Sequence, residues 1–564
     1  MKRLLFLALV PFVLISATAE GQKKGAAPFS VVEATIPEMQ AALRDGRVTS
    51  RELVLQSLVR IATYEDRLNA VVTVNPRALE EAEALDRERK AGRVRGPLHG
   101  IPIALKDIIH TKDIRTTGGA LAFEHLVPPY DATVTTLLRD GGAVIIAKTQ
   151  LTELANWVAS NPSMPNNYNG LTGFAFNPYD PRRDPRPSVS DGRNVLNTGG
   201  SSSGAGTAAS FWAANVGTET SGSILSPANA TMLAAIKPTV GRISRYGIIP
   251  ITADQDTAGP MARTVTDAAI LMGVLEGPAP DPNDAATSRC TPPPDRDYTQ
   301  YLTRDGLRGA RIGVPRAFYY DRVKAPGGEQ MRGGQSPEGL AAMNEAIEAM
   351  KAQGATIVDP VDIPSIVDPD PKNNLLEWGI CTSMDDVHEK KCSIVFAYGM
   401  KRDFNSWLAS LGDAAPVKTL TALRRWNNDH QKLGSIRYGQ SLLDVSDAMD
   451  LELHKPRYEA DRANDIRLTA THGIDAVMKE HKLDALLFPA GWGASIAARP
   501  GYPTVTVPFA MLPNAPTQAY PEGFDAKPSP FGVSFTGMAC SEPALIRIGY
   551  AFEQATKRRV PPQL

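Results

Sequence analysis

Short runs of branched apolar residues alternate with segments of helical periodicity along most of the chain. Such strand-like runs between helices are typical of a sheet that is buried on both faces. The alternation therefore predicts an α/β fold, with helices covering both faces of a central sheet. The predicted strands lie near 101–110, 143–147, 312–314, 355–358 and 484–489, and the predicted helices lie within 32–80, 135–140, 262–277, 340–353 and 464–480.

One helix start is marked by two residues. Thr49 and Glu52 have the spacing of a capping box, in which each side chain accepts a hydrogen bond from the backbone of the other. Apolar residues follow at helical spacing from Leu53 to Ile61. This pattern predicts a helix that begins at the capping box.

The chain has 564 residues, more than the ~100–200 of a common domain. Pro278–Tyr298 is rich in Pro, Asp and Ser and is predicted to be an exposed connection. The stretches 318–336 and 364–417 show no clean periodicity. We interpret residues 278–480 as a variable helical and loop section over one continuous core. A split into two domains near Pro278 is the alternative.

The N-terminus has the pattern of a secretory signal peptide. Lys2-Arg3 precede an apolar run from Leu4 to Ile15, and Ala17-Thr18-Ala19 follow. This run of about a dozen residues is shorter than the ~20 that span a bilayer. Residues 1–19 are therefore predicted to be cleaved near Ala19, which makes the protein periplasmic or secreted, without stable membrane association.

Charge and motif content exclude several classes of partner. The formal net charge is −1 and clusters of Lys and Arg are short, so no nucleic-acid surface is expected. The glycine-rich stretch at 199–206 matches neither a P-loop nor a dinucleotide-binding fingerprint. We expect no cofactor, and the chain to act as a monomer or a homodimer.

The chain contains four cysteines, which can form disulfides if the protein is in an oxidising cellular compartment. In an oxidising compartment they allow three pairings. Cys381 and Cys392 are close in sequence within an irregular region, which favours a bridge between them. A metal site that includes His388 is the weaker alternative, because no CxxC pair is present. The remaining two are Cys290 and Cys540.

The segment from Asn197 to Ala230 has small residues at both ends and Phe211-Trp212 in the middle, unlike a flexible linker. Its second cluster leaves consecutive backbone N–H groups uncovered around Ser223, as an oxyanion hole requires. Ser223 is the candidate nucleophile. A tight turn between a strand and a helix is the alternative, and turn chemistry taken alone favours it.

A serine nucleophile needs a base, and no His is paired with a GxSxG motif. Lys106 is surrounded by apolar residues, and burial lowers the pKa of a lysine. The alternative is a side chain that reaches solvent from the end of a strand. Ser201 follows Gly199-Gly200 and is a candidate proton relay. Lys148 and Lys237 are further candidate bases.

Long motifs in matching order resemble the amidase signature family: "GIPIALKD", "GAVIIAKT", "TGGSSSG", "GTETSGSILSPA" and "DQDTAGPMARTVTDAA". The resemblance runs from about residue 37 to the C-terminus and is weakest between 278 and 480. The sequence of the "GTETSGSILSPA" stretch is most similar to that of bacterial peptide amidases. The resemblance implies one large amidase domain over residues 30–560, with a central mixed β-sheet and a signature core at about 95–277.

The resemblance also implies roles for individual residues. Lys106 falls on the general base, Ser223 on the nucleophile, and Ser201 on the relay serine, which the family holds through a cis peptide bond. Ser202 falls next to the relay and is expected to support it. The oxyanion hole would consist of the backbone N–H groups of Thr220, Ser221, Gly222 and Ser223.

The sequence departs from the family pattern at several points. The path from Ser201 to Ser223 is about two residues short, which leaves Ser202 and Ser203 open as the relay. Pro178–Thr198 is longer than usual and forms either a lip over the substrate cleft or a surface insertion. Asp256 and Arg263 are expected to form a structural ion pair or cap.

The predicted activity is hydrolysis of linear carboxamides, including peptide C-terminal amides, by an exported enzyme whose substrate is a small molecule or a peptide. One alternative is the amidase subunit of a tRNA-dependent amidotransferase, which the signal peptide disfavours. A second is a catalytically silent relative that binds amides or peptides. A third is an esterase or an amidase of aryl or fatty amides.

Overall fold

The computed structural model describes residues 28–389 and 391–564, so the predicted signal peptide lies outside it. Within the described residues, eleven strands form one mixed sheet in the order β1-β3-β2-β6-β8-β7-β16-β17-β15-β9-β12. Their bounds are β1 Val71–Val74, β2 Pro102–Lys106, β3 Val144–Thr149, β6 Ala214–Glu219, β7 Ala234–Lys237, β8 Thr257–Ala262, β9 Arg311–Gly313, β12 Thr356–Val358, β15 Ala485–Pro489, β16 Thr504–Leu512 and β17 Ser529–Thr536.

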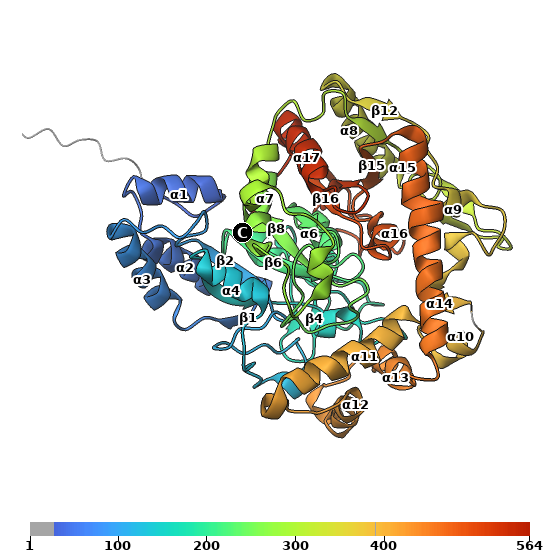
Figure 1. Cartoon of the computed structure of the whole chain (residues 1–564), viewed down its shortest axis with the longest axis horizontal. Helices are drawn as coiled ribbons and strands as arrows, with labels where there is room; N and C mark the ends of the chain where they lie inside the picture. Colours follow the sequence, from blue (N-terminus) through green and yellow to red (C-terminus); the bar gives the residue numbers. More distant parts are fainter. Residues whose placement is uncertain (1–27, 390) are drawn as a thin grey trace, which may run out of the picture.

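Helices surround this sheet (Figure 1). They are α1 Ile36–Arg44, α2 Ser50–Leu68, α3 Ala78–Lys90, α4 Thr133–Asp140, α5 Ala205–Ala208, α6 Leu225–Ala230, α7 Val265–Leu275, α8 Pro337–Ala352, α9 Pro364–Val367, α10 Met384–Glu389, α11 Val395–Ser410, α12 Leu420–Asp429, α13 Ser441–Asp447, α14 Lys455–Ile466, α15 Asp475–His481, α16 Ala494–Ala498 and α17 Glu542–Thr556.

Alternate residues of β2 enter two different hydrophobic cores. Ile103 and Leu105 pack in the large core, which also contains residues of α4 and α7. Ala104 packs in a second core with residues of α2 and α3. Since successive side chains of a strand point to opposite faces, both faces of the sheet are covered here. The predicted α/β architecture is confirmed.

The sheet joins the two halves of the chain. Strands β9, β12, β15, β16 and β17 come after residue 278 and pair into the same sheet as β1, β2, β3, β6, β7 and β8. The alternative of a domain split near Pro278 is therefore wrong. Two β-hairpins and one short parallel pair lie outside the main sheet: β4 Tyr168–Asn169 with β5 Gly173–Phe174, β10 Arg322–Lys324 with β11 Met331–Gly333, and β13 Gly379–Ile380 with β14 Cys392–Ser393.

Local sequence signals fix several element ends. Thr49 and Glu52 form the predicted capping box of α2, with both reciprocal hydrogen bonds present. Thr264 caps α7 by accepting a hydrogen bond from the backbone of Asp267. These caps satisfy N–H groups that a first helical turn leaves without partners.

The variable section is more helical than its sequence predicts. Helix α11 lies within a stretch of 364–417 where no periodicity was evident. Its first six residues, 395–400, are all buried, so its apolar pattern lacks the period of a surface helix. The predicted helix at 464–480 is part of a longer helical stretch (Figure 1). This stretch runs from Lys455, where α14 begins, to His481, where α15 ends.

All four cysteines are paired, as Cys381–Cys392 and Cys290–Cys540. The first pair is the one that sequence proximity favoured. The second fastens the 278–298 connection to the start of α17, across 250 residues. The connection is therefore covalently anchored to the core.

Candidate active site

Two parallel neighbours in the sheet, β2 and β6, carry the polar groups at the centre of the site. Their pairing places Leu105 beside Val216, so Lys106 and Thr218 come from the adjacent ends of the two strands. Lys106 Nζ donates hydrogen bonds to Ser201 Oγ at 2.8 Å and to Thr218 Oγ1 at 2.9 Å. The strand register therefore brings a lysine and two hydroxyl groups together.

Lys106 is completely buried. Burial lowers the pKa of Lys106 to about 7, although the carboxylates of Asp256 and Glu219 oppose the shift. Burial has this effect because it disfavours the charged ammonium form. At neutral pH a substantial fraction of Lys106 is a neutral amine, which can accept a proton.

The three serines after Gly199-Gly200 have different contacts. Ser201 accepts the hydrogen bond from Lys106. Ser202 bridges to β6, because its Oγ donates to the Thr218 carbonyl at 3.0 Å and accepts the Thr218 N–H at 3.2 Å. Ser203 Oγ accepts only the N–H of Ala205, at 3.4 Å. Of these three hydroxyl groups, that of Ser201 is the one in contact with Lys106 in the described chain.

The peptide bond expected to be cis at Ser201 is trans. In the described residues, the cis bonds are Asn161-Pro162 and Asp359-Pro360. That element of the expected triad is therefore wrong for this structure. A non-proline cis bond costs ~3–4 kcal/mol, and Ser201 contacts Lys106 without one.

Glycine lets the two small-residue clusters touch. A Cβ on Gly200 would lie 2.9 Å from the carbonyl oxygen of Gly222 and 3.0 Å from Cα of Ser223. Ser202 also donates its N–H to the Ser223 carbonyl at 3.2 Å. The segment that carries Ser201 is therefore packed directly on the loop that carries Ser223.

Ser223 lies in the loop between β6 and α6 and is 8% exposed. Gly222 has φ of +87°, a left-handed conformation that favours glycine. In the described part of the chain, the Ser223 hydroxyl has no hydrogen-bond partner. The backbone N–H groups of Thr220, Ser221, Gly222 and Ser223 also have no acceptor among the described residues. Four uncommitted N–H groups beside a hydroxyl form an arrangement that can hold an oxyanion.

Glu219, which the sequence motifs did not single out, supports this loop. Glu219 Oε2 accepts the N–H of Ile224 at 2.8 Å and that of Leu225 at 3.0 Å. Glu219 thereby fixes the chain immediately after Ser223. Its place at the end of β6, within the "GTETSGS" motif that also contains Thr218, is the signal that would have identified it.

The other two candidate lysines are engaged elsewhere. Lys148 Nζ donates to the Ile109 carbonyl at 2.6 Å and lies 3.5 Å from Asp107. Lys237 Nζ is buried and has no hydrogen-bond partner among the described residues. Neither donates a hydrogen bond to Ser201 or Ser223 within the described chain. Asp107 accordingly pairs with Lys148.

The expected ion pair between Asp256 and Arg263 is wrong. Asp256 precedes β8 and Arg263 follows it, so six residues at about 3.4 Å each separate them along an extended strand. Arg263 donates to backbone carbonyls, including that of Trp212 at 2.9 Å. Asp256 instead accepts a hydrogen bond from the side chain of Thr220, the first residue of the loop that carries Ser223.

The Pro178–Thr198 insertion leads into Gly199 and is held by hydrogen bonds to the 518–520 segment. Arg186 donates to the Gln518 carbonyl at 3.1 Å, and Tyr520 Oη donates to the Val195 carbonyl at 3.1 Å. Within the insertion, an aspartate pairs three times with the arginine two positions later: Asp180 with Arg182, Asp184 with Arg186, and Asp191 with Arg193.

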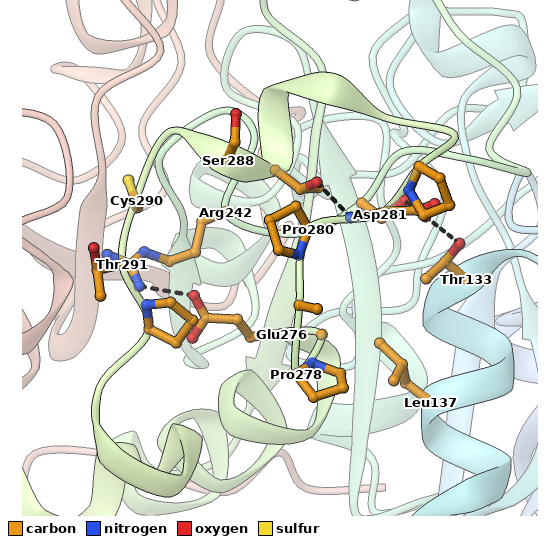
Figure 2. A pocket seen from close by; sticks show the side chains of 16 residues that line it. Thr133, Leu137, Arg242, Glu276, Pro278, Pro280, Asp281, Ser288, Cys290 and Thr291 are labelled. Carbon is orange, nitrogen blue, oxygen red and sulfur yellow. Dashed lines mark hydrogen bonds and ion pairs between the residues drawn. The ribbon is translucent and has the colours of Figure 1, made fainter.

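A cavity of about 410 Å³ lies beside the 277–292 loop, and Lys106, Ser201 and Ser223 are not among its lining residues. Figure 2 shows the side chains of its wall. Arg242 and Glu276 form an ion pair in this wall at 2.8 Å.

Across residues 28–389 and 391–564, no three His, Cys, Asp or Glu side chains are grouped so as to bind a metal ion. No helix in those ranges combines the length and the apolar character that crossing a membrane requires.

Comparison with known proteins supports one family. The amidase family model matches residues 52–546. A probable amidase from Arabidopsis thaliana is 32% identical over 99% of this chain and 97% of its own length. A glutamyl-tRNA(Gln) amidotransferase subunit from Thermosynechococcus vestitus is 30% identical over 92% of this chain and 98% of its own length.

Among solved structures, the native peptide amidase from Stenotrophomonas maltophilia superposes with a TM-score of 0.77. It is 34% identical, and the match covers 95% of this chain and 99% of that protein. The mixed sheet, the collinear motifs and these matches agree. The chain therefore belongs to the amidase signature family and is a hydrolase that acts on amide bonds.

Proposed function

We propose that this protein is an exported amidase that hydrolyses linear carboxamides through an acyl-enzyme on Ser223. One observation carries the mechanism: Lys106 Nζ contacts Ser201 Oγ at 2.8 Å in a fully buried position. The segment that carries Ser201 packs on the loop that carries Ser223. This chemistry needs only these side chains and water.

The first half of the reaction forms the acyl-enzyme. Neutral Lys106 accepts a proton from Ser201 while Ser201 accepts one from Ser223, whose oxygen attacks the carbonyl carbon of the amide. The N–H groups of Thr220 to Ser223 bind the oxyanion of the tetrahedral intermediate. Lys106 then returns the proton through Ser201 to the leaving nitrogen, and the C–N bond breaks.

The second half releases the acid. Water gives a proton to the same relay and attacks the ester of Ser223. Collapse of the second tetrahedral intermediate returns the proton to Ser223 and frees the carboxylic acid. Ser202, which bridges to both N–H and C=O of Thr218, holds Ser201 and β6 in register throughout.

Peptide C-terminal amides are the substrate class we propose first. The support is the similarity to a peptide amidase over nearly the whole of both chains. A related structure is described as that peptide amidase with the competitive inhibitor chymostatin. The proposed substrates are small-molecule or peptide amides.

Export rests on two independent features. Residues 1–19 carry the signal-peptide pattern. All four cysteines form disulfides, which persist in oxidising compartments. N-terminal sequencing of the protein from a periplasmic or secreted fraction tests this, and the mature chain is expected to begin near Glu20.

The activity is tested with Ser223→Ala and Lys106→Ala against a panel of peptide C-terminal amides, aryl amides and fatty amides. Each variant is expected to lose several orders of magnitude in kcat with an unchanged fold. Retained turnover in both variants would contradict the proposed triad. Absence of turnover in the unmodified protein on the whole panel would favour a catalytically silent amide-binding relative.

A second candidate is the amidase subunit of a tRNA-dependent amidotransferase. The observation that favours it is the likeness to curated subunits of that kind at 30% identity over most of both chains. Co-purification of a partner subunit or tRNA with the full chain would support this candidate. A monomer or homodimer that is active alone would exclude it.

A further inference from the structure

A small cavity lies beside the end of β6, and Ser223 is not among the residues that line it. Thr218, Thr220 and Asp256 are among the residues that line it. Its volume is about 10 Å³, close to the minimum that holds one water molecule. Thr218 is the residue whose Oγ1 accepts a hydrogen bond from Lys106 at 2.9 Å. Thr218 thus borders the cavity and also contacts the buried lysine.

Three hydrogen bonds hold the side chain of Asp256 in the wall of the small cavity. Its Oδ1 accepts a hydrogen bond from the Thr220 hydroxyl. Its Oδ2 accepts the N–H groups of Ile251 at 2.9 Å and Thr252 at 3.0 Å. These three donors come from two separate segments. The carboxyl group therefore has one orientation.

A larger hollow of about 350 Å³ adjoins the small cavity. Arg245, Ile248 and Asp256 line both. Tyr130 and Trp407 also line the larger hollow. Asp256 lines both cavities and is a partly exposed residue, so it lies between the small cavity and the surface. The two cavities and Thr218 together lead from the surface to Lys106.

Lys106 needs such a connection because none of its own surface is exposed. At neutral pH part of Lys106 is an ammonium, which must lose its proton to solvent before it can act as the base. Ser201 provides a path toward the substrate side, but bound substrate or the acyl group covers that side during turnover. Thr218 is the other hydrogen-bond partner of the Lys106 amine through a side chain.

We propose that Thr218, one water molecule in the small cavity and Asp256 form a proton route between Lys106 and the solvent in the larger hollow. The route rests on the proposed function, in which Lys106 is the base. Asp256 acts through Lys106 and does not contact the substrate. It is therefore a positioning residue and not part of the triad.

The proton balance involves only N–H and O–H bonds. The ammonium of Lys106 gives a proton to Thr218 Oγ1, and Thr218 passes its own hydroxyl proton to the water. The water passes a proton to the Asp256 carboxylate, and the resulting carboxylic acid releases a proton to solvent. The net change is a neutral Lys106 amine and one proton in bulk water.

The charges around both ends are compatible with this transfer. Burial raises the pKa of Asp256 to about 7, close to that of Lys106, so a proton passes between them at little cost. Arg245 favours the ionised form of Asp256 and Asp403 opposes it. The carboxylate of Glu219 also raises the pKa of Lys106.

The test uses Asp256→Asn and Asp256→Ala in the full-length active enzyme. Each is expected to lower kcat by about tenfold or more, with KM nearly unchanged. Loss of the negative charge lowers the pKa of Lys106, so the acid limb of kcat/KM should move to lower pH by about one unit. Added formate is expected to restore kcat of Asp256→Ala, because the hollow admits a small carboxylate.

Two further variants separate the route from folding. Thr218→Val keeps the shape but removes the hydroxyl, and should lower kcat without rescue by formate, whereas Thr218→Ser should retain activity. Ser406→Ala changes another residue in the wall of the hollow and should keep normal kcat. If Asp256→Ala fails to fold, as judged by its melting temperature, the Thr218 pair decides the question.

Normal kcat and an unchanged pH profile in Asp256→Asn and Thr218→Val would overturn the route. So would equal rescue of Asp256→Ala and Thr218→Val by formate. These outcomes leave the triad intact as long as Ser223→Ala is inactive. Failure of the unmodified enzyme to cleave any amide would instead contradict the proposed function itself.

Discussion

Lys106 donates a hydrogen bond to Ser201 across 95 residues of sequence, with 2.8 Å between Nζ and Oγ. The contact is possible because β2 and β6 are parallel neighbours and because Gly200 allows the Ser201 segment to lie against the nucleophile loop. A buried lysine in this position serves as a base only in its neutral form. The chemistry of the site therefore depends on the protonation state of one amine.

The pH dependence of the reaction should report the titration of Lys106. Burial lowers the pKa of Lys106 to about 7, and the protonated form, which cannot act as a base, dominates below that pH. We expect kcat/KM to fall by about tenfold per pH unit below this value. A pH–rate profile on a non-titrating peptide amide measures it. A rate that stays constant from pH 8 to pH 5 would exclude Lys106 as the base.

Gly200→Ala should disable the site without disturbing the sheet. The new Cβ would lie 3.0 Å from Cα of Ser223, so the nucleophile loop must shift. We expect kcat to fall by roughly a hundredfold. Gly379→Ala is the matched control, because a Cβ there meets nothing within 4 Å. Equal activity of the two variants would contradict the packing described here.

Ser202→Ala should weaken both stability and activity. The substitution removes a hydroxyl that hydrogen-bonds the N–H and the carbonyl of Thr218, both at a buried position. Leaving a buried N–H without a partner costs about 1–3 kcal/mol. Urea unfolding and kcat are the readouts. Ser203→Ala, whose hydroxyl accepts one long hydrogen bond, should change both far less.

The two disulfides should differ in their contribution to stability. Cys290–Cys540 closes a loop of 250 residues and Cys381–Cys392 one of 11. By chain entropy the first stabilises by about 5 kcal/mol and the second by about 3 kcal/mol. Double Cys→Ser variants of each pair, compared by melting temperature, measure the difference. A larger loss from the short loop would contradict the entropic account.

The α/β class and the strands β2, β3, β9, β12 and β15 were predictable because these strands are short, apolar and separated by marked helix ends. The strands β1, β6, β7, β8, β16 and β17 of the same sheet were not predicted. Lys106 and Ser223 could be proposed because their motifs place an apolar-surrounded lysine and an uncovered loop in the sequence. Helix α11 could not, because consecutive buried residues hide its period. In this case tertiary burial overrides the surface pattern.

The contacts of charged residues were the least predictable. Asp256 and Arg263 are close in sequence, yet the extended strand β8 separates them. Glu219 binds the backbone after Ser223, a role that depends on how the loop folds back on β6. Such partners are set by the path of the chain rather than by residue type. For the same reason, the sequence alone allowed three alternative disulfide pairings of the four cysteines.

The most direct test of the central claim is covalent labelling with a fluorophosphonate, located by peptide mass spectrometry. The account predicts a single adduct on Ser223, formed by the unmodified enzyme at a rate that falls as pH drops below about 7. It also predicts that Lys106→Ala and Ser201→Ala label far more slowly. An adduct on another residue, or labelling of Ser223 at an undiminished rate in Lys106→Ala, would contradict it.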